Sequence, residues 1–382
     1  MPAANRLLIQ VVPQLRPAAC GVSDHAISLA QELKAEFGIG TAFVVLNSNE
    51  TCNSPFPTVY CKPAQLFEAC ASLSKGQPGA VLVHYSGYGY SADGAPLVLA
   101  NALQRVRESR QFRIGVYFHE VSADGMPWTS AFWHKRRQRE VAGRIARECD
   151  LIATNLSRHA DLLEREVPQD DAHTIHRLPV FSNIGERAEI ALMSARRPAM
   201  AVFGLSGTRQ KSYKHLSVLG EMLRSLGIKE ILDIGLECNA PTSLTGIPVR
   251  RMGVLPSAEL GNLLAQTSYG FVPHPSFCLA KSGIFAGLCA HGTVPILPES
   301  FPREVDGLKD GIHLVSPQTA KTALAGGLDS CSTAAWNWYA AHRLRVHAAT
   351  YSQSLIQPSS EAETEMCGAG KAAGNQVGHA SS

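Results

Sequence analysis

The sequence has no marked excess of either charge and no long apolar segment. Its 382 residues hold 35 lysines and arginines against 32 acids, which leaves a net charge of +3. A broad nucleic-acid-binding surface carries a larger positive excess, so that class of protein is not indicated. No apolar run approaches the roughly 20 residues that a membrane-spanning helix needs. The chain enters an apolar run at 7–12 without a signal-peptide pattern, which predicts a cytoplasmic protein and leaves open a peripheral contact with the inner face of the membrane.

Several motifs of common enzyme classes are also missing. The ten cysteines form no CxxC pair and no regular disulfide spacing, so we interpret them as reduced thiols of a cytosolic protein. The sequence contains no HExxH, no DxD and no other paired metal-ligand spacing, and neither a metal nor another cofactor is predicted. It has no GxGxxG, no GxSxG and no Walker lysine, which disfavours a dinucleotide enzyme, an α/β-hydrolase and a P-loop NTPase.

Short apolar runs alternate with helical segments along most of the chain. Runs that do not alternate with polar residues are typical of strands buried on both faces, and their alternation with helices predicts parallel sheets. The restart of this pattern near residue 199 predicts an α/β protein with two Rossmann-like domains that face a cleft. The first series of runs lies at 7–12, 42–46, 80–86, 113–119 and 150–155, and the second at about 199–204, 230–235, 249–253, 269–274 and 293–298.

The segments between and after these series predict the domain boundaries. We expect a first domain at 1–181, a linker rich in loop-forming residues at 182–197, and a second domain at 198–332. The segment 333–356 is predicted as one long helix. The small polar residues of 357–382 are predicted to form a disordered tail.

Two segments of the first domain place glycine and polar residues after strands. Gly21 and Val22 precede a helix expected to begin near Ser23, so they belong either to a ligand-binding loop or to an ordinary capped helix. His119 and Glu120 lie at the carboxyl end of the strand at 113–119, where doubly wound folds keep ligand groups. The histidine either donates to a sugar hydroxyl or a phosphate, or serves only the backbone of its loop.

An aromatic cluster follows these residues, formed by Trp128, Phe132 and Trp133. Such a cluster more often packs inside a protein than it binds a ligand. Sugar stacking and an exposed partner surface are the other two interpretations.

The second domain carries two groups of candidate anion-binding residues. Arg209, Lys211 and Lys214 follow its first strand and a glycine-containing loop, a pattern that favours a diphosphate clamp over a merely solvated helix face. Lys281, Ser282 and Gly283 open a helix of small residues, and free N–H groups at a helix N-terminus suit a phosphate. The alternative for these three is a plain helix with an exposed lysine.

Taken together, these segments resemble the glycosyltransferases of the GT-B fold, and in particular glycosyltransferase family 4. The resemblance extends over about residues 7–315 and rests on the order and spacing of its stretches, and the terminal helix is similar to the one that crosses back onto the first domain in that fold. The matching stretches are CGVSDHAISLAQEL near the N-terminus, FHE after the strand at 113–119, LPVFSNI before the linker, VFGLSGTRQKSYKHL at the start of the second domain and AKSGIFAGLCAHGTVPILPESFPREVDGLKDGIHLV near its end.

The resemblance implies a reaction. It implies transfer of a sugar from a nucleotide-sugar donor to a saccharide or lipid-linked acceptor, with retention of the anomeric configuration and without a metal. The second domain of such an enzyme holds the nucleotide diphosphate, and by position Arg209, Lys211 and Lys214 are the candidates for neutralising the leaving group. In the first domain, Gly21 and Val22 match the family's glycine loop.

The resemblance also implies catalytic residues. His119 matches the histidine that contacts the transferred sugar, and with the adjoining Glu120 it is the candidate catalytic group.

The sequence departs from the family at one point. The family carries two glutamates, eight residues apart, that hold the sugar and the ribose. Counting back from Gly292, their places hold Leu279 and Gly287. Either Lys281 and Ser282 take over part of the diphosphate contact, or the donor site has decayed.

Three functional hypotheses follow. The first is a GT-B glycosyltransferase whose leaving group is stabilised by pre-placed cations and N–H groups. The second, favoured by the two missing glutamates, is a non-catalytic GT-B protein that binds a sugar nucleotide or a partner glycosyltransferase. The third is a sugar-nucleotide epimerase on the same fold.

Overall fold

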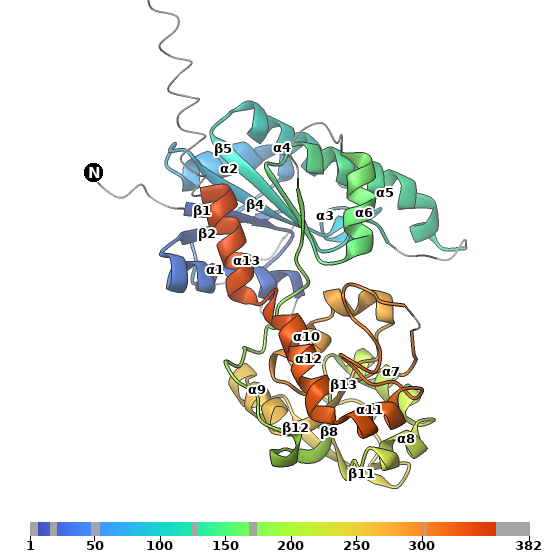
Figure 1. Cartoon of the computed structure of the whole chain (residues 1–382). Helices are drawn as coiled ribbons and strands as arrows, with labels where there is room; N and C mark the ends of the chain where they lie inside the picture. The colour runs from blue at the N-terminus through green and yellow to red at the C-terminus, as the bar shows by residue number, and fades with distance from the viewer. Residues whose placement is uncertain are drawn as a thin grey trace, which may run out of the picture.

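The protein folds around two separate sheets that lie in two parts of the molecule (Figure 1). The computed structural model describes residues 7–15, 21–46, 54–123, 125, 128–167, 174–301 and 303–356. The tail predicted at 357–382 lies outside the described residues. Within the described part of the chain, no helix combines the length and the apolar character that a bilayer span requires.

The first sheet is parallel throughout, with strand order β3-β2-β1-β4-β5-β6-β7. Its central strands are buried on both faces, as their unbroken apolar sequences predict. β3 and β7, which were not predicted, are short edge strands with partly exposed residues. The strands are β1 (Leu7–Val12), β2 (Gly40–Leu46), β3 (Thr58–Cys61), β4 (Gly79–Tyr85), β5 (Phe112–Phe118), β6 (Leu151–Thr154) and β7 (Ile175–Arg177).

Helices join these strands and lie against the sheet (Figure 1). The parallel pairing of successive strands requires such crossovers. The helices are α1 (Gly21–Phe37), the 3₁₀ turn η1 (Pro63–Gln65), α2 (Leu66–Leu73), α3 (Gly87–Tyr90), α4 (Leu97–Glu108), α5 (Ser130–Arg147) and α6 (Ser157–Glu166).

The second sheet has the order β10-β11-β9-β8-β12-β13, with only the β10–β11 pair antiparallel among its described strands. Every strand predicted from the second series of runs is present, and β10 is an added strand of two residues. The strands are β8 (Arg197–Phe203), β9 (Glu230–Ile234), β10 (Ser243–Leu244), β11 (Ile247–Gly253), β12 (Thr267–Phe271) and β13 (Val294–Ile296). The helices are η2 (Met193–Ala195), α7 (Ser206–Leu216), α8 (Gly220–Ser225), α9 (Ser257–Ala265), η3 (Ser276–Lys281), α10 (Gly283–Ala290), α11 (Ala320–Gly326) and α12 (Leu328–Ala340).

The segment predicted as a single helix at 333–356 is instead two helices and a final turn. α12 packs against α10 in the second domain, whereas α13 (Leu344–Tyr351) packs against α1 in the first (Figure 1). Glu186 stabilises the break, because its carboxylate accepts hydrogen bonds from the Leu344 amide at 2.8 Å and from the Tyr339 hydroxyl. The C-terminal segment therefore crosses to the first domain as predicted, but as two helices separated by a break.

The last described residues complete the first sheet. The π-helical turn Ser352–Ile356 places Leu355 against β5, where a Cβ added to Gly115 would lie 2.7 Å from a Leu355 methyl carbon. Glycine at this position leaves the room that the leucine side chain occupies. The turn thus covers a face of the sheet whose carboxyl end forms the site described next.

Candidate functional site

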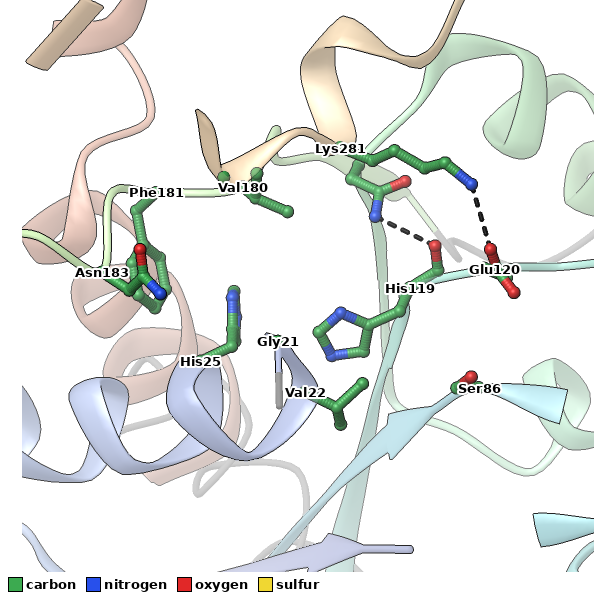
Figure 2. A pocket seen from close by; sticks show the side chains of 12 residues that line it. Gly21, Val22, His25, Ser86, His119, Glu120, Val180, Phe181, Asn183 and Lys281 are labelled. Atoms are coloured by element: carbon green, nitrogen blue, oxygen red, sulfur yellow. Dashed lines mark hydrogen bonds and ion pairs between the residues drawn. The ribbon is translucent and has the colours of Figure 1, made fainter. Parts of the chain in front are cut away.

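A cavity of about 370 Å³ lies where the carboxyl end of the first sheet meets the second domain (Figure 2). The first domain contributes residues that follow β4, β5 and β6, together with the start of α1. The second domain contributes the junction of η3 and α10. The lining residues are Gly21, Val22, His25, Ser86, His119, Glu120, Asn155, Val180, Phe181, Asn183, Lys281 and Gly283.

Most of the residues predicted for the first domain and for the α10 terminus line this cavity. Ser282 instead serves the helix, since its hydroxyl accepts from the Phe285 amide at 3.2 Å and bonds to His274 at 2.8 Å. α10 therefore begins at Gly283, and Lys281 ends the preceding 3₁₀ turn. A Cβ added to Gly283 would lie 4.0 Å from the Asn183 amide oxygen, so the surrounding packing leaves space at this point of the cavity.

An ion pair connects the two domains across the cavity. Lys281 Nζ lies 3.0 Å from Glu120 Oε1, and both side chains remain partly exposed (Figure 2). Glu120 follows β5 in the first domain, whereas Lys281 precedes α10 in the second. An anion that entered the cavity beside Lys281 would compete with this carboxylate for the same ammonium group.

A group of histidines adjoins the cavity. The ring centroid of His25 lies 5.1 Å from that of His119, 5.5 Å from that of His84 and 5.4 Å from that of His347. Burial lowers the pKa of all four, to about 3 for His119 and to about 4 for His347. Neighbouring rings lower the pKa of His25, His84 and His119 further, because two close imidazolium charges repel each other. The four rings are therefore neutral at neutral pH.

Two lining residues bury polar atoms that bond to nothing else in the described part of the chain, namely His25 Nε2 and Asn155 Oδ1. The His25 ring is stacked on Phe181, with centroids 4.1 Å apart, and on Tyr117, with centroids 4.8 Å apart. The Asn155 amide is held by its nitrogen, which donates to the backbone oxygen of His119 at 3.1 Å. Because buried polar groups usually have partners, these two atoms point to a polar ligand that would supply them.

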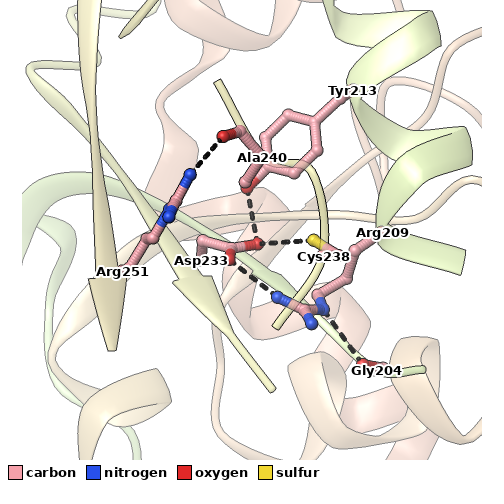
Figure 3. Close-up of polar contacts among 7 residues, drawn as sticks. All are labelled: Gly204, Arg209, Tyr213, Asp233, Cys238, Ala240 and Arg251. Atoms are coloured by element: carbon pink, nitrogen blue, oxygen red, sulfur yellow. Dashed lines mark hydrogen bonds and ion pairs between the residues drawn. The ribbon is translucent and has the colours of Figure 1, made fainter. Parts of the chain in front are cut away.

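Arg209, predicted as a diphosphate ligand, lies in a buried network of the second domain (Figure 3). Its Nη1 donates to the Asp233 carboxylate at 2.7 Å, and its Nε donates to the Gly204 carbonyl at 3.2 Å. The Tyr213 hydroxyl donates to the other Asp233 oxygen at 2.7 Å. The Arg209 side chain is fully buried and is not among the described residues that line this cavity or the one around Lys211. Its guanidinium thus joins α7 to β9, and its Nη2 has no hydrogen-bond partner among the described residues.

Lys211 and Lys214 point to different places. Lys211 lines a second cavity of about 280 Å³ with His215, His274 and Glu299, at the carboxyl ends of β12 and β13. The two cavities are linked through His274, which bonds to the Ser282 hydroxyl beside Lys281. Lys214 is exposed on α7 and is not among the described residues that line either cavity.

The sequence interpretation missed several lining residues. His25 lies one turn into the helix that follows β1, and Asn155 directly follows β6, so their positions after strands are the signal that could have identified them. Phe181 and Asn183 come from the segment that leads to the second domain, and no local pattern marks them. Leu279 and Gly287, which stand where the resembled family has glutamates, are both buried in apolar packing. Leu279 is 1% exposed, and a Cβ on Gly287 would lie 2.9 Å from an Ile184 methyl carbon.

Known proteins resemble this chain in structure but not in sequence. No protein-family profile matches the chain, and no curated protein matches it in sequence. It is similar to an alpha-glucosyltransferase solved with UDP-glucose and DNA containing an abasic site, with 13% identity, a TM-score of 0.51 and coverage of 95% of this chain and 98% of that one. It is also similar to the N-terminal domain of trehalose-6-phosphate phosphatase from Candida albicans, with 10% identity, a TM-score of 0.54 and coverage of 91% and 95%. A trehalose-6-phosphate protein from E. coli bound with UDP-2-fluoro glucose gives 10% identity, a TM-score of 0.52 and coverage of 90% and 98%.

At these identities the likeness shows the fold alone. The fold is GT-B, with two Rossmann-like domains that face a cleft and a C-terminal segment that returns to the first domain. The fold class predicted from the sequence is therefore confirmed. Membership of glycosyltransferase family 4 stays a prediction.

Proposed function

We propose that the protein is a glycosyltransferase that transfers a sugar from a nucleotide-sugar donor to a saccharide or lipid-linked acceptor. The observation that carries the proposal is the cavity between the two domains, which sets a cation of the second domain opposite neutral polar groups of the first. A nucleotide sugar has the same division, with a charged diphosphate and an uncharged, hydroxyl-rich sugar. The solved structures of similar fold that hold UDP-glucose and UDP-2-fluoro glucose add support.

The proposed donor position follows from the charges. The diphosphate would lie beside Lys281 and the free N–H groups that begin α10, with Lys211 near the nucleotide end. As the bond from the anomeric carbon to the diphosphate breaks, its electron pair stays on the diphosphate oxygen. The cation and the N–H groups would stabilise that growing charge. Arg209 would act only indirectly, by holding the strand edge that it joins.

In the proposed reaction, the acceptor hydroxyl replaces the diphosphate on the anomeric carbon. The acceptor hydroxyl oxygen bonds to the anomeric carbon with retention of configuration, and its proton passes to an oxygen of the departing diphosphate. In this proposal the positive charge comes from the protein and not from a metal. His119 would contact the sugar, and Glu120 would be released from Lys281 when the diphosphate takes its place.

A second candidate function is a non-catalytic protein that binds a sugar nucleotide or a partner glycosyltransferase. One observation favours it, namely that the two positions of the family's glutamates are occupied by buried Leu279 and Gly287. Loss of those acids would leave the sugar and the ribose with fewer contacts.

Release of the nucleotide separates these candidates. The purified protein would be incubated with UDP-glucose, GDP-mannose and other nucleotide sugars, with acceptor sugars and with EDTA present. Release of UDP or GDP together with a new glycoside supports the proposal. Binding without release supports the non-catalytic candidate, and an altered sugar still attached to its nucleotide would indicate an epimerase. An activity lost in EDTA and restored by a divalent cation would contradict the metal-independent reaction.

We also propose that the first domain contacts an anionic membrane surface near the start of α5. Trp128 is 78% exposed, Trp133 is 74% exposed and Phe132 is 41% exposed, a grouping that packing does not explain. α5 carries six lysines and arginines against one glutamate, and Arg136 and Arg137 are exposed one turn after the aromatic residues. Interfacial aromatic side chains combined with cations suit a negatively charged lipid surface.

Vesicle sedimentation tests this contact. The protein should pellet with vesicles that contain phosphatidylserine and not with phosphatidylcholine alone. Trp133→Ser should lower the bound fraction, whereas Leu236→Ser, which changes an exposed apolar residue of the second domain, should not. Equal pelleting of the two variants, or of the protein with both vesicle types, would contradict the proposal.

A further inference from the structure

A chain of hydrogen bonds runs from α1 through the first sheet to the cavity. Gln10 on β1 donates from Nε2 to the Ala26 carbonyl oxygen at 3.1 Å, and its Oε1 lies 2.6 Å from His84 Nε2. His84 Nδ1 lies 3.3 Å from His119 Nε2. Gln10 and His84 are fully buried, whereas His119 is partly exposed and lines the cavity. The chain therefore links two buried residues, which the proposed reaction does not use, to the candidate sugar contact.

The donor and acceptor in each of these hydrogen bonds can be assigned by starting from the Ala26 carbonyl. The Ala26 carbonyl accepts only, so the nitrogen of the Gln10 amide must face it and the oxygen must face His84. That oxygen also accepts only, so His84 Nε2 carries a proton. A neutral imidazole has one N–H, so His84 Nδ1 is an acceptor and His119 Nε2 must donate to it.

The series of hydrogen bonds keeps this direction only while the His84 and His119 rings are both neutral. Burial lowers the pKa of His84 well below its usual value and lowers the pKa of His119 to about 3, and the nearby His347 lowers both further. At neutral pH each ring therefore has a single N–H. For His119 that N–H is at Nε2, which leaves Nδ1 with a free lone pair. The ring edge that carries this second nitrogen faces the open cavity in Figure 2.

We infer that Gln10 and His84 are positioning residues that hold His119 as its Nε2–H tautomer, so that Nδ1 accepts a hydrogen bond from a hydroxyl group of the bound sugar. The inference rests on the proposed function for the identity of the ligand. In this arrangement His119 accepts a hydrogen bond from the sugar, whereas one interpretation of the sequence had it donate to a sugar hydroxyl or a phosphate.

Asn155 points to the same ligand chemistry. Its nitrogen is engaged by the His119 carbonyl, so the amide orientation is fixed and the Oδ1 atom is the one without a partner among the described residues. Oδ1 and His119 Nδ1 are both acceptors. This side of the cavity therefore suits the hydroxyl hydrogens of an uncharged sugar and disfavours an anionic group, which belongs beside Lys281 at the other side.

The tautomer is measured first, on the unliganded full chain. Protein labelled with ¹⁵N-histidine would be examined by NMR at neutral pH, and the His119 signals assigned by their loss in His119→Asn. We expect a protonated Nε2 and an unprotonated Nδ1. A ring protonated at Nδ1 would overturn the inference, whatever the protein binds.

Variants test the chain of bonds. Gln10→Met keeps the length of the side chain but removes the acceptor for His84, and His84→Leu removes the acceptor for His119. Either should convert His119 to a mixture of tautomers. The control is His347→Gln, which changes another histidine of the group and should leave the His119 tautomer as it is. An unchanged tautomer in both Gln10→Met and His84→Leu, provided that they fold, would overturn the positioning role.

Binding separates the inference from the proposed function. Calorimetric titration with UDP and with UDP-glucose, and with GDP and GDP-mannose, gives the gain in affinity that the sugar provides. Gln10→Met should leave the affinity for the nucleotide diphosphate within about two-fold of the original and reduce the gain from the sugar about three- to ten-fold. An equal loss for both ligands would contradict the positioning role. If the tautomer is as inferred but no nucleotide sugar binds, the proposed function fails and the tautomer assignment stands without its ligand.

Discussion

The carboxyl ends of the two sheets border the same region, yet they hold their polar groups in different ways. The first domain presents neutral groups that bond to one another, from Gln10 through His84 to His119. The second domain presents cations that are already paired, Arg209 with Asp233 inside the domain and Lys281 with Glu120 across the cavity. One edge is ordered by hydrogen-bond direction and the other by charge.

This difference separates structural groups from groups that are free to respond to a ligand. The Arg209–Asp233 pair is almost completely buried, so exchanging its partner would require the protein to open. The Lys281–Glu120 pair is 27% and 41% exposed, so an incoming anion can displace the carboxylate at little cost. Position after a strand is thus insufficient to identify a ligand cation, because burial decides whether it can reach the ligand.

The largest expected effect concerns the buried pair. Asp233→Ala leaves the fully buried Arg209 guanidinium without its counter-charge and the Tyr213 hydroxyl without its acceptor, and it should lower the free energy of unfolding by about 3–5 kcal/mol. Urea denaturation followed by circular dichroism would measure this change.

The matched control replaces the whole pair. The double variant Arg209→Met with Asp233→Leu removes both charges and should lose clearly less stability than Asp233→Ala alone. A loss below about 1 kcal/mol for the single variant would mean that the pair is not structural, and the comparison between the two ion pairs would break.

The next effect is a dependence of stability on pH that arises from the buried, neutral histidines. The pKa of the buried His347 is lowered to about 4 by burial, whereas in the unfolded chain it has its ordinary value of about 6.5. Between these values the unfolded state binds the proton and the folded state does not. The stability that this histidine contributes is therefore complete above about pH 6.5 and is lost as the pH falls toward 4, by up to about 1.4 kcal/mol per pH unit.

Urea denaturation at a series of pH values between 7 and 4.5 would measure this slope. His347→Gln removes one titrating ring and should make the slope smaller over the same range. His134 is partly buried and lies outside the group of four, so His134→Gln is the control for replacing a histidine elsewhere in the first domain. Equal slopes for the original protein and His347→Gln would contradict a neutral, buried His347.

A smaller effect, on ligand binding, sharpens the contrast between the two ion pairs. Lys281→Ala should weaken binding of UDP or GDP by about 1–3 kcal/mol, because a charge-assisted hydrogen bond is lost. Glu120→Gln should do the opposite and strengthen binding, because it removes the carboxylate that occupies the ammonium group. Calorimetric titration of both variants would check the two signs. If both variants weaken binding, Glu120 does not compete with the ligand.

The smallest effect distinguishes two exposed lysines on one helix. Lys211 lines the second cavity, whereas Lys214 is not among its described lining residues. Lys211→Ala should weaken binding of UDP or GDP by about 0.5–1 kcal/mol, and Lys214→Ala, its matched control, should change it by less than half of that. A larger effect for Lys214→Ala would assign the diphosphate to the solvent side of α7.

The fold could be predicted because buried parallel strands have a strong local signal. The runs at 80–86 and 230–235, for example, became β4 and β9 with only small changes at their ends. The break between α12 and α13 has no such signal, since neither proline nor glycine marks it. It depends on Glu186, which approaches Leu344 only in the folded chain.

The candidate site could be predicted in position but only partly in its contacts. His119 and Lys281 were placed at the cavity because strand ends and helix starts are local features. Arg209 pairs with Asp233, which lies near the end of a different strand. Gly235, just after that strand, leaves room for the guanidinium, because a Cβ there would lie 3.0 Å from Arg209 Nε. Such pairings are decided by tertiary structure.

The contact of Leu355 with Gly115 has a consequence for the order of folding. β5 is synthesised early, but the side chain that covers it arrives with the last described turn. While the second domain emerges from the ribosome, an apolar strip on β5 of the first domain is therefore uncovered. It becomes covered only when Leu355 contacts Gly115, and these residues are far apart in the sequence. Completion of the first domain is thereby coupled to synthesis of the second, and a nascent chain stopped before α13 would expose that strip to aggregation.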